Sequence, residues 1–219
     1  MPALTTELLR QLSSLLIPRN EMLTLLRAVV DDFYGDSLDT RWNTVVSGSG
    51  IAAVLQDGSP SNILLETGTT INSTSELTEG GFEKWNVTDR LTVRAISRIN
   101  AITTVFHMPI NLQNSALTNR ISIDYNTSTG DTGWRLRTAA PGFTSSAVIL
   151  AADVLWHTFD LAIQSGSVKA RIDGGAVVEN TSNIPLDNLQ LRLLIANSAA
   201  VSRTAQWDLV MLLPGRALF

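Results

Sequence analysis

The sequence predicts a mainly β protein, an antiparallel two-sheet sandwich with a short N-terminal helical segment. Charged residues make up only 16% of the 219 residues, against about 25% in an ordinary soluble domain, so Ser, Thr and Asn must supply much of the polar surface. From residue 36 onward, runs rich in Val, Ile, Thr and Trp alternate with Gly, Pro and Asp turn residues, which is typical of many short strands. Before residue 36, leucines recur at helical spacing instead.

Two short helices are predicted in residues 1–35. In the first, Leu8, Leu12 and Leu15 recur at steps of four and three, and a proline at position 18 ends it. In the second, an apolar seam steps by three, four and three along Leu23, Leu26, Val30 and Phe33. Apolar stripes on short helices must be covered. These seven residues are therefore the predicted interface of an attachment or oligomerisation segment, with packing on the sandwich itself as the alternative.

Residues 36–219 carry the predicted strands. Alternation of apolar and polar residues marks 121–125, 134–137, 159–163 and 168–172, whereas 189–196 and 207–213 are apolar on both faces, as in central strands. Residues 88–99 fit a strand by their alternation or a helix capped by Asp89, and we favour the strand. No strand–helix–strand rhythm occurs, so a sandwich whose two sheets share one core is favoured over a parallel sheet.

Two stretches carry a resemblance to a known family. The first is 156–163 (WHTFDLAI), followed by Gly166, by 168–174 (VKARIDG) and by 181–185; the second is 33–42 (FYGDSLDTRW). They resemble the concanavalin A-like (laminin-G/pentraxin-type) jelly-roll family, in which Trp-His or Trp-Tyr opens a strand and a hairpin ends in an Asp-Gly turn. The resemblance implies a jelly-roll sandwich over residues 36–219.

Within that family, the general sequence pattern of the chain is similar to that of phage virion proteins with a helical N-terminal attachment segment. The resemblance implies a non-enzymatic virion structural protein: a capsid decoration or cement protein, a head-fibre protein or a tail or baseplate component. Its expected partners are its own copies, guessed as a trimer, and other virion proteins such as the major capsid or tail proteins. The alternative is a lectin-like receptor-recognition module that binds a cell-surface glycan. A hydrolase with dispersed carboxylates is the third interpretation.

Composition excludes several classes of partner. The formal net charge is −4 with a pI near 5.1, and the basic residues are scattered, which disfavours nucleic acid. No apolar run approaches the ~20 residues of a membrane span. No basic stretch precedes the first apolar residues, so we expect no secretory signal and a virion protein made in the host cytoplasm. Cysteine is absent, which excludes disulfides, cysteine-ligated metals and thiol nucleophiles.

No catalytic residue, cofactor or metal site is predicted. Glycoside hydrolases of this jelly roll place carboxylates two apart on a strand, so that both face the sugar, and no two acidic residues of this chain have that spacing. The two histidines, His107 and His157, are interpreted as hydrogen-bonded strand and rim residues rather than as bases.

Two further motifs are given structural interpretations. Residues 48–53 (GSGIAA) match a dinucleotide fingerprint, but the turn residues at 57–60 leave no helix to receive a phosphate, which favours a tight turn between strands. The acids Asp31, Asp32, Asp36 and Asp39 are interpreted as a polar junction, with a structural cation as the alternative.

The five tryptophans are the candidate stacking platforms for a sugar. Trp134 and Trp207 share faces with apolar neighbours, so both are predicted to lie in the core. Trp85 lies among polar residues, Glu-Lys before it and Asn after it. It is therefore the candidate exposed glycan-binding residue.

Overall fold

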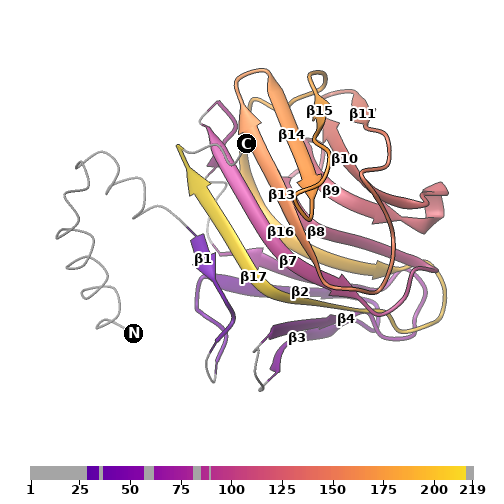
Figure 1. The fold of residues 1–219 in the computed structure, drawn as a ribbon. Helices are drawn as coiled ribbons and strands as arrows, with labels where there is room; N and C mark the ends of the chain where they lie inside the picture. The colour runs from indigo at the N-terminus through magenta and orange to yellow at the C-terminus, as the bar shows by residue number, and fades with distance from the viewer. Residues whose placement is uncertain (1–28, 35–36, 57–61, 81–84, 89, 216–219) are drawn as a thin grey trace.

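The structure, a computed structural model, describes residues 29–34, 37–56, 62–80, 85–88 and 90–215. These residues form two antiparallel sheets that pack face to face (Figure 1). The eight-stranded sheet has the order β15 (Val178–Asn180), β14 (Ser167–Ile172), β13 (His157–Gln164), β7 (Leu91–Ile99), β17 (Thr204–Pro214), β4 (Asn62–Glu66) and β3 (Ile51–Gln56), with β1 (Val29–Asp31) also pairing with β17.

The nine-stranded sheet forms the second layer. Its order is β11 (Phe143–Ser145), β10 (Gly133–Ala139), β9 (Arg120–Asn126), β8 (Val105–Gln113), β16 (Asn188–Asn197), β5 (Thr74–Glu79) and β2 (Trp42–Ser47), with β12 (Leu150–Ala151) on β10 and β6 (Trp85–Asn86) on β16. A 3-10 turn, η1 (Thr127–Thr129), follows β9. In the part of the chain that the structure describes, no helix is long and apolar enough to cross a membrane.

One apolar core lies between the sheets. Because successive side chains of a strand point to opposite faces, alternate residues of the central strands enter this core. Ile121 and Ile123 of β9 and Phe159 of β13 are fully buried there. Trp134 and Trp207 are also fully buried, which confirms their predicted place in the core.

The strand predictions from alternation are confirmed. Residues 88–99 contain the strand β7, so the helical alternative for this stretch is wrong. The GSGIAA motif lies at the turn between β2 and β3, where Gly48 has a left-handed φ of 61° and Gly50 N donates to Ser47 O. A Cβ on Gly48 would lie 2.3 Å from Ser73 Oγ, so this position requires glycine. The interpretation of the motif as a turn is confirmed.

The hairpin that carried the resemblance is β13–β14. Its second strand ends in a tight Asp-Gly turn, in which Asp173 and Gly174 both have positive φ angles, 53° and 69°. Asp173 Oδ1 accepts from Thr158 N at 2.8 Å, which ties the turn to the start of β13. Asp tolerates the left-handed backbone that this turn position requires.

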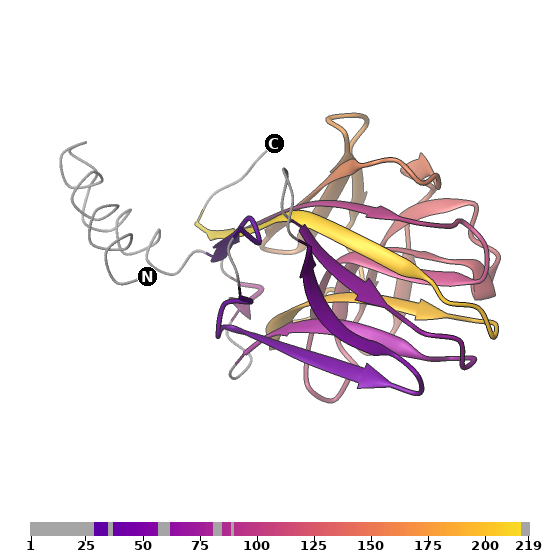
Figure 2. The same ribbon diagram turned by 90° about the horizontal axis from the view of Figure 1, so that it is seen from below.

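The start of the sandwich differs from the prediction. The second helix was expected to continue through Val30 and Phe33, but Val29–Asp31 forms strand β1, in which Val29 pairs with Leu212 of β17. Figure 2 shows the indigo β1 beside the yellow β17. Two adjacent β-branched valines favour this extended backbone. The sheet thus begins before the boundary predicted at residue 36.

The structure describes two of the seven residues of the predicted interface, and these two differ in exposure. Val30 is 54% exposed, whereas Phe33 is buried and its ring lies 6.1 Å from that of Trp42. The other five seam residues lie outside the described residues: Leu8, Leu12, Leu15, Leu23 and Leu26.

Candidate functional site

The outer face of the nine-stranded sheet carries polar side chains from six strands. Cross-strand pairing places them in one row, Arg137, Ser122, Asn111, Arg192, Thr78 and Asn43, which come from β10, β9, β8, β16, β5 and β2. A neighbouring row contains Arg135, Asp124 and Glu76, and a third contains Phe143, Arg120, Gln113 and Gln190. We call these residues, together with Asp131 of the following loop, the polar face.

The polar face is a fixed surface, because its deepest side chains are buried and bonded to each other. Ser122 and Asp124 are fully buried, and Ser122 Oγ donates to Asp124 Oδ2 at 2.7 Å. Asn111 is 1% exposed, and its Nδ2 donates to Gln113 Oε1 at 3.1 Å. Interlocked polar side chains of this kind cannot change rotamer independently.

Every carboxylate of the polar face is bound to an arginine. Arg137 Nη1 donates to Asp124, while Arg137 Nη2 donates to both oxygens of Asp131 at 2.8 and 2.7 Å. Arg192 forms an ion pair with Glu76, which also accepts from Thr78 Oγ1 at 2.9 Å. Each carboxylate is therefore fixed in position by an arginine, through a hydrogen bond or an ion pair.

The arginines on this face lie close to one another. Burial and, to a smaller extent, the positive charge of Arg120 lower the pKa of Arg137 to about 10. Burial also lowers the pKa of Arg120. Arg137 remains charged at neutral pH, since its pKa of about 10 lies well above 7.

Four buried polar atoms of the face have no hydrogen-bond partner among the described residues: Asn111 Oδ1 and the Nε atoms of Arg135, Arg137 and Arg192. Asn111 Oδ1 is buried, and among the described residues no group donates to it. A buried acceptor without a donor costs free energy. This atom lies in the centre of the first row, between Ser122 and Arg192, where a donor from a bound molecule or water would satisfy it.

An exposed aromatic ring borders the polar face. Phe143 of β11 pairs with Ala139 of β10 and is 57% exposed. Its ring centroid lies 5.9 Å from Arg137 Cζ, so the ring packs beside the guanidinium. An exposed ring next to amides and hydroxyls is the arrangement that stacks on one face of a sugar and binds its hydroxyl groups.

The residue predicted for this role lies elsewhere. Trp85 is only 7% exposed; its Nε1 donates to Glu79 Oε2 at 2.7 Å, and its ring belongs to the core cluster beside Leu189. The exposure predicted for Trp85 is therefore wrong. The prediction relied on the polar neighbours of Trp85 in the sequence. The indole instead packs in the core, where its single N–H donates to a buried carboxylate.

The two histidines are not part of the polar face. His107 is fully buried, with Ser97 Oγ 3.1 Å from its Nε2 and Trp134 Nε1 3.4 Å from its Nδ1. Burial lowers its pKa to about 3, so the ring is neutral. His157 lies between Asp173 and Asp153, with Nδ1 and Nε2 at 2.6 and 2.8 Å from their oxygens. The interpretation of both as hydrogen-bonded residues is confirmed.

The acidic junction is also structural in the part that is described. Asp31 Oδ2 accepts from Trp42 Nε1 at 2.6 Å, and Asp39 accepts from Arg41 N at 2.9 Å. Asp36 lies outside the described residues. Among the described residues, no group of three or more His, Cys, Asp or Glu side chains could hold a metal ion.

Comparisons with known proteins identify the fold. No family model and no curated protein matches the sequence. Solved structures do match. A lichenase (β-1,3-1,4-glucanase) from a mouse hindgut metagenome has a TM-score of 0.63 and 16% identity, over 85% of this chain and 99% of that one. The chain shares the two-sheet jelly-roll sandwich fold of that structure.

Two further matches are similar to the same extent. A β-1,3-glucanase from Mycobacterium marinum has a TM-score of 0.61 and 13% identity, over 84% of this chain and 97% of that one. An immunostimulatory antigen and pseudo β-1,3-glucanase of Mycobacterium tuberculosis has a TM-score of 0.59 and 14% identity, over 86% and 98%. At these identities the likeness is one of fold.

These matches overturn the predicted virion structural role. The three structures described above share the sandwich over most of the chain; two are named glucanases and one a pseudo-glucanase, and none of the three is named as a virion component. The prediction failed because hairpin motifs describe the geometry of the sandwich, which is common to many functions. The glycan-binding alternative is the one that these neighbours favour.

Proposed function

We propose that this protein binds a β-glucan on its polar face without hydrolysing it. The observation that carries the proposal is the exposed ring of Phe143 beside a fixed row of amides, hydroxyls and paired charges. Sugar sites combine an apolar platform with a few polar groups in fixed positions. The structural neighbours named as glucanases support the choice of β-1,3 or mixed β-1,3-1,4 glucan as the ligand.

The charge distribution of the polar face suits a neutral ligand. Asp124, Asp131 and Glu76 are each paired with an arginine of the same face, so none of these three carboxylates requires a cation from a ligand. The face crosses seven strands from β11 to β2, and six steps of about 4.8 Å give roughly 29 Å. A surface of that length accommodates an oligosaccharide rather than a single sugar.

Hydrolysis is disfavoured by the positions of the carboxylates. A retaining glycosidase needs two carboxyl groups about 5 to 5.5 Å apart, one of them free to act as an acid. On β9 the position two residues before Asp124 is Ser122, which is a hydroxyl donor to that same carboxylate. Asp124 is also fully buried beneath Arg137. A carboxylate held in this way is a poor nucleophile. Asp131, the second carboxylate on Arg137, is bound through both of its oxygens, so it is not placed to protonate a leaving group.

Calorimetric titration with a β-1,3-gluco-oligosaccharide and with a mixed β-1,3-1,4 oligosaccharide tests the proposal. We expect saturable binding of at least one of them, and no reducing ends released from the corresponding polysaccharides. Replacing Phe143 with Ala removes the platform, so we expect binding to weaken about tenfold or more.

Tyr34→Ala is the matched control. Tyr34 is 78% exposed, and it follows β1, which belongs to the eight-stranded sheet rather than to the sheet that carries the polar face. This substitution removes an exposed ring of similar size and should leave the affinity unchanged. Equal binding by wild type and Phe143→Ala would contradict the proposed site. Release of reducing sugar that Glu76→Gln or Asp124→Asn abolishes would show an enzyme instead.

A further inference from the structure

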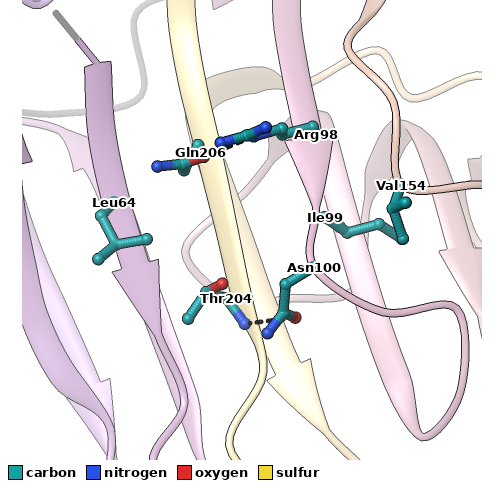
Figure 3. Close-up of a pocket in the computed structure, with 7 residues that line it drawn as sticks. All are labelled: Leu64, Arg98, Ile99, Asn100, Val154, Thr204 and Gln206. Carbon is teal, nitrogen blue, oxygen red and sulfur yellow. Dashed lines mark hydrogen bonds between the residues drawn. The ribbon is translucent and has the colours of Figure 1, made fainter.

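A pocket lies on the other side of the sandwich, on the outer face of the eight-stranded sheet (Figure 3). It has a volume of about 500 Å³, within the range of about 300 to 1,000 Å³ that small-molecule sites occupy. It is lined by Leu64, Arg98, Ile99, Asn100, Val154, Thr204 and Gln206. These residues come from β4, from the end of β7, from β17 and from the segment that precedes β13.

The pocket contains a cation held in a fixed position. Arg98 Nε donates to Gln206 Oε1 at 2.6 Å, and the guanidinium lies 4.9 Å from the centroid of the Trp156 ring. Arg98 forms no ion pair with any residue that the structure describes. Because Nε is already used, the two terminal nitrogens remain as a pair of parallel N–H donors. This end of a guanidinium matches a carboxylate.

Uncharged donors lie beside this cation. Asn100 Oδ1 accepts from Thr204 N at 2.9 Å, as the dashed line in Figure 3 shows. The bond fixes the Asn100 amide and leaves its NH2 group for a ligand. The Thr204 hydroxyl lines the same pocket. A ligand that accepts hydrogen bonds next to its charged end would be bound by these groups.

Apolar side chains form the walls. Leu64 lies on one side and Val154 on the other in Figure 3, with Arg98 and Gln206 between them. Val154 is 47% exposed, so a ligand that covers it removes apolar surface from water. The chemistry around the cation is therefore mainly neutral and apolar.

We propose that this pocket binds a small aliphatic monocarboxylate, with its carboxylate on the Arg98 guanidinium and its hydrocarbon part between Leu64 and Val154. A single cation with apolar walls matches one negative charge better than the two of a phosphate monoester. The carboxylate belongs to a free acid or to a uronic acid sugar, and the apolar walls favour the first. This site is on the opposite sheet from the polar face and does not depend on glucan binding.

NMR titration of the full chain with N-acetyl-leucinate tests the proposal, with N-acetyl-leucinamide, glucuronate and inorganic phosphate as parallel probes. We expect saturable shifts of the Arg98, Asn100 and Thr204 amides with N-acetyl-leucinate. The neutral amide, which has the same hydrocarbon part, should bind at least tenfold more weakly, and so should glucuronate and phosphate.

The variant Arg98→Gln should weaken the binding of N-acetyl-leucinate at least tenfold. Arg90→Gln is the matched control: Arg90 is an exposed arginine eight residues earlier, just before β7, roughly 26 Å away at 3.3 Å per residue. It should bind like wild type. Binding that Arg98→Gln leaves unchanged, equal binding of the neutral amide, stronger binding of glucuronate or phosphate, or no saturable shift with any probe would overturn the proposal.

Discussion

The outer faces of the two sheets use arginine in opposite ways. On the polar face, Arg137 is nearly buried and shared between Asp124 and Asp131. On the eight-stranded sheet, Asp160 is shared between Arg94 and Arg171 at its centre, while Arg98 near the end of β7 is exposed and forms no ion pair with a described residue. Paired charges build a rigid surface for a neutral ligand, whereas an unpaired charge in a pocket selects a charged one.

The two faces should differ most in how far the loss of a carboxylate lowers the free energy of unfolding. Asp124→Asn removes one of the two carboxylates that hold the buried Arg137 guanidinium and leaves Asp131 as the other, and we expect a loss of about 3 kcal/mol in the free energy of unfolding. Asp160→Asn is the comparison, because its partners Arg94 and Arg171 are partly exposed to solvent, and there we expect about 1 to 2 kcal/mol. Urea unfolding measures both. Equal losses would contradict the distinction between a buried and a solvated network.

The next effect is on acid stability and concerns His107, in the core behind the polar face. Its pKa is about 3 in the folded state and about 6.5 in the unfolded chain. Only the unfolded state gains this proton as the pH falls from 6.5 towards 3, so stability is lost in that window. The slope is about 1.4 kcal/mol per pH unit, or about 2 kcal/mol at pH 5.

NMR of the imidazole ring measures that prediction directly. The His107 resonances should not titrate between pH 8 and pH 5. A midpoint near 6.5 for this ring would show that solvent reaches the core and that the buried position is wrong.

His157, on the eight-stranded sheet, should behave in the opposite sense. Burial lowers its pKa, but hydrogen bonds to Asp173 and Asp153 outweigh burial, and the pKa is raised above 6.5. The proton is therefore bound more tightly in the folded state, and its stabilisation is complete below pH 6.5 and is lost as the pH rises through the folded pKa.

The melting temperature between pH 6 and pH 9 tests this contribution. His157→Gln should remove the part of the decline in this window that the wild type shows. A variant whose Tm falls with pH as steeply as that of the wild type would show that His157 is not the group responsible.

The smallest effect should be on Arg98. Its side chain is exposed, and its interactions within the protein are with Gln206 and Trp156, so Arg98→Gln should change the free energy of unfolding by less than about 0.5 kcal/mol. Urea unfolding beside the NMR titration keeps this stability effect separate from the loss of binding. A loss as large as that of Asp160→Asn would mean that Arg98 has a structural role instead.

Local patterns in the sequence predicted much of the sandwich. Alternation located β7, β9, β13 and β14, and an Asp-Gly pair located the turn at Asp173. The burial of Trp134 and Trp207 also followed from their neighbours along the strand. Period 2 is a property of each strand alone, so such predictions need no knowledge of which strands pair.

The same reasoning failed where burial depends on a distant partner. Trp85 has polar neighbours in the chain, but Leu189 and Glu79 bury its ring and bind its N–H. Val30 was predicted to lie on the apolar seam of a helix, but residues 29–31 form a strand because they pair with β17. The virion role was inferred from a general similarity of sequence pattern, and it was contradicted by the solved structures that share the fold.

The sequence by itself determined the class of fold, because the alternation of each strand and the chemistry of each turn are local. Only the tertiary structure decided the sites. Ser122, Asn111 and Arg192 belong to three strands, and cross-strand register alone places them in one row. Arg98, Gln206 and Trp156 likewise meet only after β7 and β17 pair. Register is set by the packing of the whole core, and no short stretch of sequence contains it.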